Sequence, residues 1–139
     1  MPGLERISGK ATWLLSRANA RAHTLLAEAL AAEGVRGYHV RILAALDQYG
    51  PSSQADIGRR TGIDTSDVVV TLDELTAAGL AARTRDPRDA RRNIVMLTDE
   101  GRERLERLLG VVDEVQERVL EPLSATERKS LLRLLRKLG

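Results

Sequence analysis

The sequence of 139 residues contains no cysteine, few lysines and no long apolar run. The absence of cysteine excludes disulfide bonds, thiol-based redox sensing and thiolate metal sites. No apolar segment approaches the ~18 residues that a membrane span requires. The opening residues, MPGLERISGKATWLL, have neither the long apolar core nor the cleavage site of a secretory signal peptide. We therefore expect a cytoplasmic protein that does not enter a membrane.

Signatures of enzymes and of metal proteins are also missing. The chain has no nucleophile-elbow motif, no glycine loop for phosphate and no metal-binding helix motif. His23 and His39 are the only histidines, and their spacing fits no metal motif. We expect neither an enzyme nor a bound metal or cofactor.

The charged residues that are present are unevenly distributed. Lysine occurs only at Lys10, Lys129 and Lys137, and the other strong cations are arginines, which favour two-point contacts with phosphate or carboxylate. The net charge is only +2. Residues 83–92 contain five arginines and two aspartates, a local charge of +3. Residues 64–79 contain four carboxylates and no lysine or arginine, a local charge of −4.

Apolar periodicity predicts a long helix near each end of the chain. The hydrophobic fraction of 42% is that of a globular protein. Apolar residues recur at three- and four-residue steps over about residues 9–32 and again over about residues 98–120. Pro122 ends the second helix, and SATE at residues 124–127 is a capping box that opens a last one. The apolar stripes of these terminal helices are larger than the core of a small middle region requires.

The middle of the chain is divided into short elements. After a helix over about residues 38–49, the segments SSQADIGRRTG and DTSDVVVTLDELTAAG each predict a short helix that ends at glycine. Ser53 is the expected N-cap of the first, and Asp64 or Thr65 of the second. Two short helices joined by Thr-Gly-Ile-Asp form a helix-turn-helix pattern. LAARTR and NIVMLT, on either side of the turn DPRDARR, then predict a β-hairpin.

These elements predict a mainly α-helical protein with a small β-hairpin, that is, a winged helix-turn-helix with long N- and C-terminal helices. The terminal helices are best explained if they bury one another across a two-fold homodimer. We therefore expect one compact protomer in an intertwined dimer. Its parts are a dimerisation helix at 1–34, a winged helix-turn-helix lobe at 35–98 and dimerisation helices at 99–139.

Four segments resemble the MarR family of bacterial transcriptional regulators, and the resemblance covers nearly the whole chain. DPRDARR (86–92) fits the family's wing pattern Asp-x-Arg-Asp-x-Arg. LTDEGRERL (97–105) fits its Leu-Thr-x-x-Gly-Arg opening of the next helix. IGRRTGID (57–64) and LDELTAAGLAAR (72–83) match its helix-turn-helix and the segment that leaves it.

The resemblance implies a homodimer with two recognition helices in successive major grooves and wings in the flanking minor grooves. We accordingly expect a sequence-specific transcriptional regulator, a repressor, that binds a pseudo-palindromic operator in double-stranded DNA. The resemblance also implies that a small anionic or phenolic effector releases the DNA. The alternative is a ligand-binding or protein-interaction dimer on the same scaffold whose DNA binding is weak or lost.

The arginines of the wing are the first candidate DNA contacts. By motif position, Arg91 is the wing-tip arginine that enters the minor groove, and Asp89 holds it in place. A narrow minor groove concentrates negative potential, and a guanidinium sheds water at low cost. Alternatively, Arg91 pairs with Asp89 and rests on the surface. Arg88 and Arg92 are expected to contact phosphates.

The second helix of the motif departs from the family pattern. Val69 and Val70 stand where relatives tend to carry Ser or Thr followed by Arg or Lys. In one interpretation, Thr65 and Ser66 hydrogen-bond to DNA, and Val69 or Val70 packs on thymine methyl groups. In the other, the valines are buried in the protein and DNA binding is weak. Val68 already completes the core stripe, so at least one of the two valines should be exposed.

The first helix of the motif carries candidate phosphate contacts. We expect Arg59 or Arg60 to contact phosphate and the other to be solvated or paired with Asp56. Ser53 and Gln54 could donate hydrogen bonds to phosphate, although capping is the simpler role for Ser53.

A ligand site is indicated by less specific features. Trp13, the only tryptophan, could line a pocket between the dimer helices and the lobe, but core packing is the simpler role. His39 with Arg41 or Arg17 could accept a carboxylate, or His39 could be a packing residue with satisfied hydrogen bonds. Trp13, Arg17, His39 and Arg41 are thus the candidate ligand-binding residues.

Overall fold

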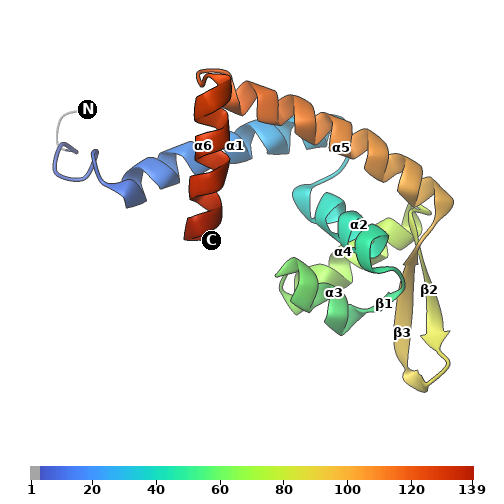
Figure 1. The fold of residues 1–139 in the computed structure, drawn as a ribbon. Coiled ribbons are helices and arrows are strands. Elements are labelled where there is room, and N and C mark those ends of the chain that lie inside the picture. The colour runs from blue at the N-terminus through green and yellow to red at the C-terminus, as the bar shows by residue number, and fades with distance from the viewer. Residues whose placement is uncertain (1–3) are drawn as a thin grey trace. The chain divides into compact units, whose positions relative to one another are not determined.

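The structure is a computed structural model that describes residues 4–139 (Figure 1). It confirms a mainly helical chain with one small antiparallel sheet. Within the described residues, every helix is too short or too polar to span a bilayer. In chain order the elements are α1 (Ala11–Ala32), α2 (Gly37–Tyr49), β1 (Ser52–Ser53), α3 (Gln54–Thr61), α4 (Thr65–Ala77), β2 (Ala81–Asp86), β3 (Asp89–Leu97), α5 (Asp99–Leu120) and α6 (Ala125–Leu138).

The chain forms two compact units. Unit 1 comprises the segment up to Ala29 together with Val112–Gly139, and unit 2 comprises Leu30–Val111. Unit 2 therefore contains the helix-turn-helix and the hairpin, with the end of α1 and the first half of α5.

Side-chain caps fix the two helices of the motif in unit 2. Ser53 precedes α3, and its hydroxyl oxygen accepts a hydrogen bond from the backbone N–H of Asp56 at 3.2 Å. Gly62 ends α3 in the left-handed conformation, with φ of 69°. Asp64, rather than Thr65, is the cap of α4, because its carboxylate accepts the N–H of Ser66 at 3.1 Å. The expected cap of α3 is confirmed, and the choice left open for α4 is resolved.

One face of α4 is buried in the core of unit 2. Val68, Leu72 and Leu75 are at most 2% exposed, as their helical spacing predicted. α4 contacts α2, where Ile42 and Leu43 are fully buried. Each step along an α-helix turns the side chain by about 100°. Val69 and Val70, the next two residues after Val68, are therefore directed away from this core.

The sheet has the strand order β1–β3–β2, and all its pairings are antiparallel. β3 is central, and Ser52 of β1 pairs with Val95 of β3. The sequence did not predict β1, because two residues are too few to show the alternation that identifies a strand.

The hairpin turn is shorter than the sequence predicted. Residues 86–92 were expected to form the turn, but Asp86 pairs with Asp89, so only Pro87 and Arg88 join the strands. The carboxylate of Asp86 accepts the N–H of Arg88 at 2.9 Å, which closes the chain within two residues. Arg91 therefore lies on β3 and not in the turn itself.

α4 ends in a Schellman motif. Gly79 has φ of 77°, a conformation that favours glycine. The N–H of Leu80 donates to the carbonyl of Leu75 at 2.9 Å, and that of Gly79 donates to the carbonyl of Thr76 at 3.0 Å. The chain therefore turns sharply from α4 into β2.

The end of α4 is joined directly to the start of α5. The hydroxyl of Thr98 donates to the carbonyl of Gly79 at 2.7 Å and accepts the N–H of Gly101 at 3.0 Å. Gly101 is buried, and a Cβ added there would overlap the carbonyl of Leu80 and lie 2.7 Å from Leu97 Cδ1. These contacts explain physically why Thr and Gly occur in Leu-Thr-x-x-Gly-Arg.

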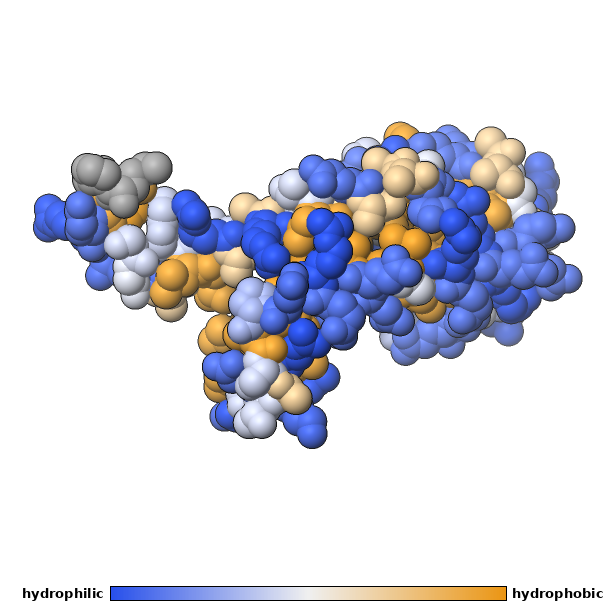
Figure 2. Space-filling model, turned by 90° about the horizontal axis from the view of Figure 1, so that it is seen from above, coloured by the Kyte–Doolittle hydropathy of each residue, from blue (hydrophilic) through white to orange (hydrophobic). Residues whose placement is uncertain are grey.

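Unit 1 leaves much apolar surface uncovered. Leucines on α1 and α6 are largely exposed, among them Leu14 at 54% and Leu134 at 47%. Figure 2 shows hydrophobic side chains, in orange, at the molecular surface among hydrophilic ones. An open groove of about 830 Å³ is lined by α1, α5 and α6 within this unit, mostly by leucine, valine and alanine. Trp13 is half-buried, so it is not a core residue of the protomer.

Candidate nucleic-acid interface

The outward face of α4 carries the valines that the sequence singled out. Val69 is 37% exposed and Val70 is 54% exposed, so neither belongs to the core. Thr65 and Ser66, in the first turn of the same helix, are exposed as well. The expectation that at least one valine is exposed is confirmed, and both are. α4 thus presents two small apolar side chains next to two hydroxyls.

Two of the four carboxylates in residues 64–79 are paired with arginines of unit 2. Glu74 receives two hydrogen bonds from the guanidinium of Arg36, at 2.8 and 3.1 Å. Asp73 receives one from Arg83 of β2 at 2.7 Å. The guanidinium of Arg36 lowers the pKa of the Glu74 carboxyl. The sequence showed a local charge of −4 but not these partners, because Arg36 lies 38 residues from Glu74.

His39 connects α2 to the same helix. It is 6% exposed, its Nδ1 accepts the N–H of Arg36 at 2.9 Å, and its Nε2 lies 3.6 Å from Glu74. Burial, assisted by the charge of Arg36, lowers the pKa of His39. Of the two roles considered for this histidine, the geometry favours the packing residue, because the ring is buried and its Nδ1 is hydrogen-bonded within the protein.

The two arginines of α3 have different surroundings. Arg59 pairs with Asp56, as expected for one of them. Arg60 lies with its guanidinium carbon 4.3 Å from the centre of the Tyr49 ring and donates to the hydroxyl of Ser52 at 3.0 Å. Two further candidates lie at the start of α3, where Ser53 is buried and serves as the cap, and Gln54 is half-buried.

Asp89 holds the base of the Arg91 side chain on β3. One carboxylate oxygen of Asp89 accepts the backbone N–H of Arg91 at 3.0 Å and its Nε at 3.1 Å. The side chain of Arg91 is nevertheless 91% exposed. Its hydrogen bonds lower the pKa of the Asp89 carboxyl. Arg85 of β2, Arg88 and Arg92 are exposed as well, so the wing presents four arginines to its surroundings.

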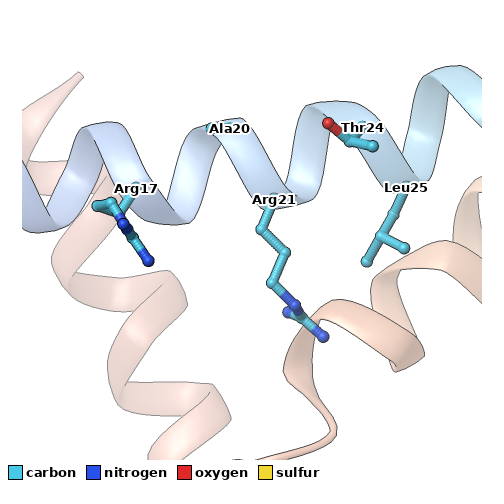
Figure 3. A pocket seen from close by; sticks show the side chains of 5 residues that line it. All are labelled: Arg17, Ala20, Arg21, Thr24 and Leu25. Atoms are coloured by element: carbon cyan, nitrogen blue, oxygen red, sulfur yellow. The ribbon is translucent and has the colours of Figure 1, made fainter.

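Two ligand candidates lie together on α1. The guanidinium of Arg17 lies 5.9 Å from the centre of the Trp13 ring. Arg17 also borders an open hollow of about 440 Å³, where Arg17, Arg21 and Leu25 point to the same side of α1 (Figure 3). Arg21, which the sequence did not single out, donates to the carbonyl of Val119 at 2.9 Å.

The other two ligand candidates belong to unit 2 and do not form a joint site there. Arg41 donates to the carbonyl of Thr61 at 3.3 Å and lies 5.7 Å from the Tyr38 ring, whereas His39 is engaged by Arg36 and Glu74. Within residues 4–139, no cluster of three or more His, Asp or Glu side chains could hold a metal ion.

Known proteins share this fold and part of this sequence. The model of the MarR family matches residues 33–92. The transcriptional repressor CouR, solved on a 23-mer DNA duplex, superposes with a TM-score of 0.87 and 31% identity, over 97% of this chain and 96% of CouR. The chain belongs to the MarR family. This family consists of transcriptional regulators.

Two further relatives of this MarR-family protein carry information on function. The transcriptional repressor NicR of Pseudomonas putida is 35% identical over 96 residues, which are 69% of this chain but only 61% of NicR, less than two thirds of its length. BpsR of Bordetella bronchiseptica, whose DNA binding is regulated by 6-hydroxynicotinic acid, superposes with a TM-score of 0.84 and 28% identity over 95% of this chain and 94% of BpsR.

Proposed function

We propose that this MarR-family protein is a repressor that binds double-stranded DNA sequence-specifically, as a homodimer on a pseudo-palindromic operator. The observation that carries the proposal is the outward face of α4. Thr65, Ser66, Val69 and Val70 are exposed there, while two carboxylates of the helix are held by arginines of unit 2. CouR, which has the same fold, was solved on a DNA duplex, and this supports the proposal.

Arginines outside α4 supply the sequence-independent part of the proposed binding. We assign phosphate contacts to Arg60, Arg88 and Arg92, and a minor-groove contact to Arg91. Arg59 contributes less, because Asp56 offsets its charge. Gln54 can reach phosphate from the start of α3, whereas Ser53 is buried as the cap.

The proposed function is tested by fluorescence anisotropy with the DNA upstream of the protein's own gene. We expect that duplex to be bound at least ~10³-fold more tightly than a scrambled duplex at physiological salt. Both affinities should fall as salt rises, because counterions are released from phosphate. Equal affinity for the two duplexes would instead favour the alternative, a ligand-binding or protein-interaction dimer.

The open groove of unit 1 supports the homodimer. Its lining is almost entirely apolar, and several of its leucines are more than 40% exposed in the single chain. The removal of such apolar surface from water lowers the free energy of the protein. A second copy of the same groove is the partner that a two-fold assembly provides.

We expect light scattering to give twice the chain mass of 15.3 kDa at micromolar concentration. Leu134→Glu with Leu135→Glu should shift the mass toward one chain, because two charges cannot be buried in an apolar interface without large cost. Arg136→Glu, on the same helix but outside the groove lining, is the matched control and should leave the dimer intact. A parental mass of 15.3 kDa would refute the dimer.

We also propose that a small anionic or phenolic ligand releases this protein from DNA. The support is the regulation of BpsR by an aromatic carboxylic acid and the position of Arg17 beside both Trp13 and an open hollow. We assign Trp13 and Arg17 as the first candidates for contact with this ligand.

The exposed valines of α4 predict contacts with the methyl groups of thymine. Replacing every thymine of the operator by uracil removes the 5-methyl groups and should weaken binding about fourfold for each buried methyl, since one buried methyl is worth ~0.8 kcal/mol. Val69→Ala with Val70→Ala should bind both duplexes with nearly equal affinity. Anisotropy at one salt concentration measures the effect. If the double variant still distinguishes thymine from uracil as strongly as the parent, the valines do not contact these methyl groups.

A further inference from the structure

Tyr49 is an exposed aromatic side chain that has no role in the proposed function. It lies at the end of α2 with 51% of its surface exposed. The guanidinium carbon of Arg60 lies 4.3 Å from the ring centre, well within the range of a cation–π contact. The ring therefore limits the motion of a long side chain that would otherwise sample many rotamers.

Ser52 holds the same guanidinium from a second direction. Its hydroxyl donates to the carbonyl of Gly50 at 2.8 Å, so its only proton is used there. The hydrogen bond to Arg60, at 3.0 Å, is therefore donated by Arg60 and accepted by Ser52. Ser52 is 3% exposed and pairs with the central strand β3, which makes it a fixed anchor.

These two contacts leave Arg60 suited to bind an anion. Tyr49 and Ser52 are uncharged and do not neutralise Arg60. Arg59, in contrast, is partly neutralised by its ion pair with Asp56. A guanidinium has five N–H groups, and the bond to Ser52 occupies one. The positive charges of Arg60 and of Arg92, an arginine of the wing, both interact with the carboxylate of Asp56. Both arginines therefore lie near this carboxylate.

We propose that Tyr49 and Ser52 are positioning residues that hold the guanidinium of Arg60 ready to bind a DNA phosphate. This inference rests on the proposed function. A side chain that is ordered before binding loses less conformational freedom on the DNA, which we expect to be worth roughly three- to tenfold in affinity for each protomer. Tyr49 acts through Arg60 and makes no contact with a base.

A double-mutant cycle on the full chain tests this coupling. The variants are Tyr49→Leu, Arg60→Gln, both together, and Tyr49→Phe, with Arg59→Gln as the matched control from the same helix turn. Affinities for the operator and for a scrambled duplex are measured by anisotropy at several salt concentrations. Circular dichroism and thermal unfolding verify that each variant is folded.

We expect Tyr49→Leu to weaken binding three- to tenfold per protomer, and Tyr49→Phe, which keeps the ring face, to restore it. Arg60→Gln should weaken binding further and reduce the slope of log affinity against log salt by about 0.9 for each phosphate that is no longer neutralised. The double variant should match Arg60→Gln alone. The losses should be the same on both duplexes, because phosphate carries no sequence information. Arg59→Gln should change the slope less.

Two outcomes overturn the inference while leaving the proposed function in place. One is a Tyr49→Leu variant that binds like the parent. The other is an equal loss from Tyr49→Leu with and without Arg60, which would mean that the ring acts only through the fold. A parent that binds no duplex overturns both proposals, and is distinguishable from either result. If Tyr49→Leu does not fold, Ser52→Ala replaces it in the same cycle, with the same criteria.

Discussion

Arg91→Ala is expected to weaken operator binding by ~1–3 kcal/mol for each minor groove that the arginine no longer enters, or roughly 5- to 150-fold. The side chain is 91% exposed, and Asp89 fixes its base through the backbone N–H and Nε. A narrow minor groove concentrates the negative potential that such a guanidinium meets, so the loss should be greatest with A·T-rich flanks.

Anisotropy on operators with A·T-rich and G·C-rich flanks measures this effect at one salt concentration. Arg88→Ala is the matched control, because an exposed arginine of the turn that contacts phosphate should weaken both operators alike and lower the salt slope. Circular dichroism should show an unchanged fold. If Arg91→Ala binds as tightly as the parent, the arginine only pairs with Asp89 on the surface.

Gly101→Ala is expected to lower the free energy of unfolding by about 3 kcal/mol or more. The added Cβ overlaps the carbonyl oxygen of Leu80 and comes within 2.7 Å of Leu97 Cδ1, and backbone cannot yield as a flexible side chain does. Overpacking of a tight site typically costs about 1–3 kcal/mol, and contact with backbone places this substitution at the upper end or beyond.

Gly110→Ala is the matched control on the same helix, because a Cβ there meets no atom within 4 Å. It should stabilise the protein by about 0.5–1 kcal/mol, since glycine is unfavourable inside a helix. Urea unfolding of the parent and both variants gives the comparison. A Gly101→Ala variant as stable as Gly110→Ala would show that the junction with Leu80 is not tightly packed.

Features encoded within a few residues could be predicted from the sequence. Ser53 caps α3, and Ser124 and Glu127 exchange hydrogen bonds in the expected capping box at 3.2 and 2.9 Å. The buried stripe of α4 likewise follows from helical periodicity. In each case the residues that interact are neighbours in the chain, so their spacing alone identifies the contact.

Features that join distant segments could not be predicted in this way. Arg36 and Glu74 meet only because α2 packs on α4, and nothing in the spacing of 38 residues indicates it. The contact of Arg60 with Tyr49 depends on the turn between α2 and α3. The extent of the hairpin depends on the pairing of Asp86 with Asp89, which interstrand hydrogen bonds determine. Composition therefore showed the negative charge of α4 but not the two arginines that offset part of it.

The junction between Thr98 and Gly79 has a mechanical consequence. One hydroxyl ties the carbonyl that ends α4 to the first turn of α5, and the N–H of Thr98 donates to Leu80 at 3.2 Å. We therefore expect the end of α4, the base of the hairpin and the start of α5 to move together. α5 continues as one unbroken helix from Asp99 to Leu120, through the boundary at Val111. We therefore expect a rotation of the first turn of α5 to carry the end of α4 with it, without any segment of unit 2 unfolding or becoming ordered.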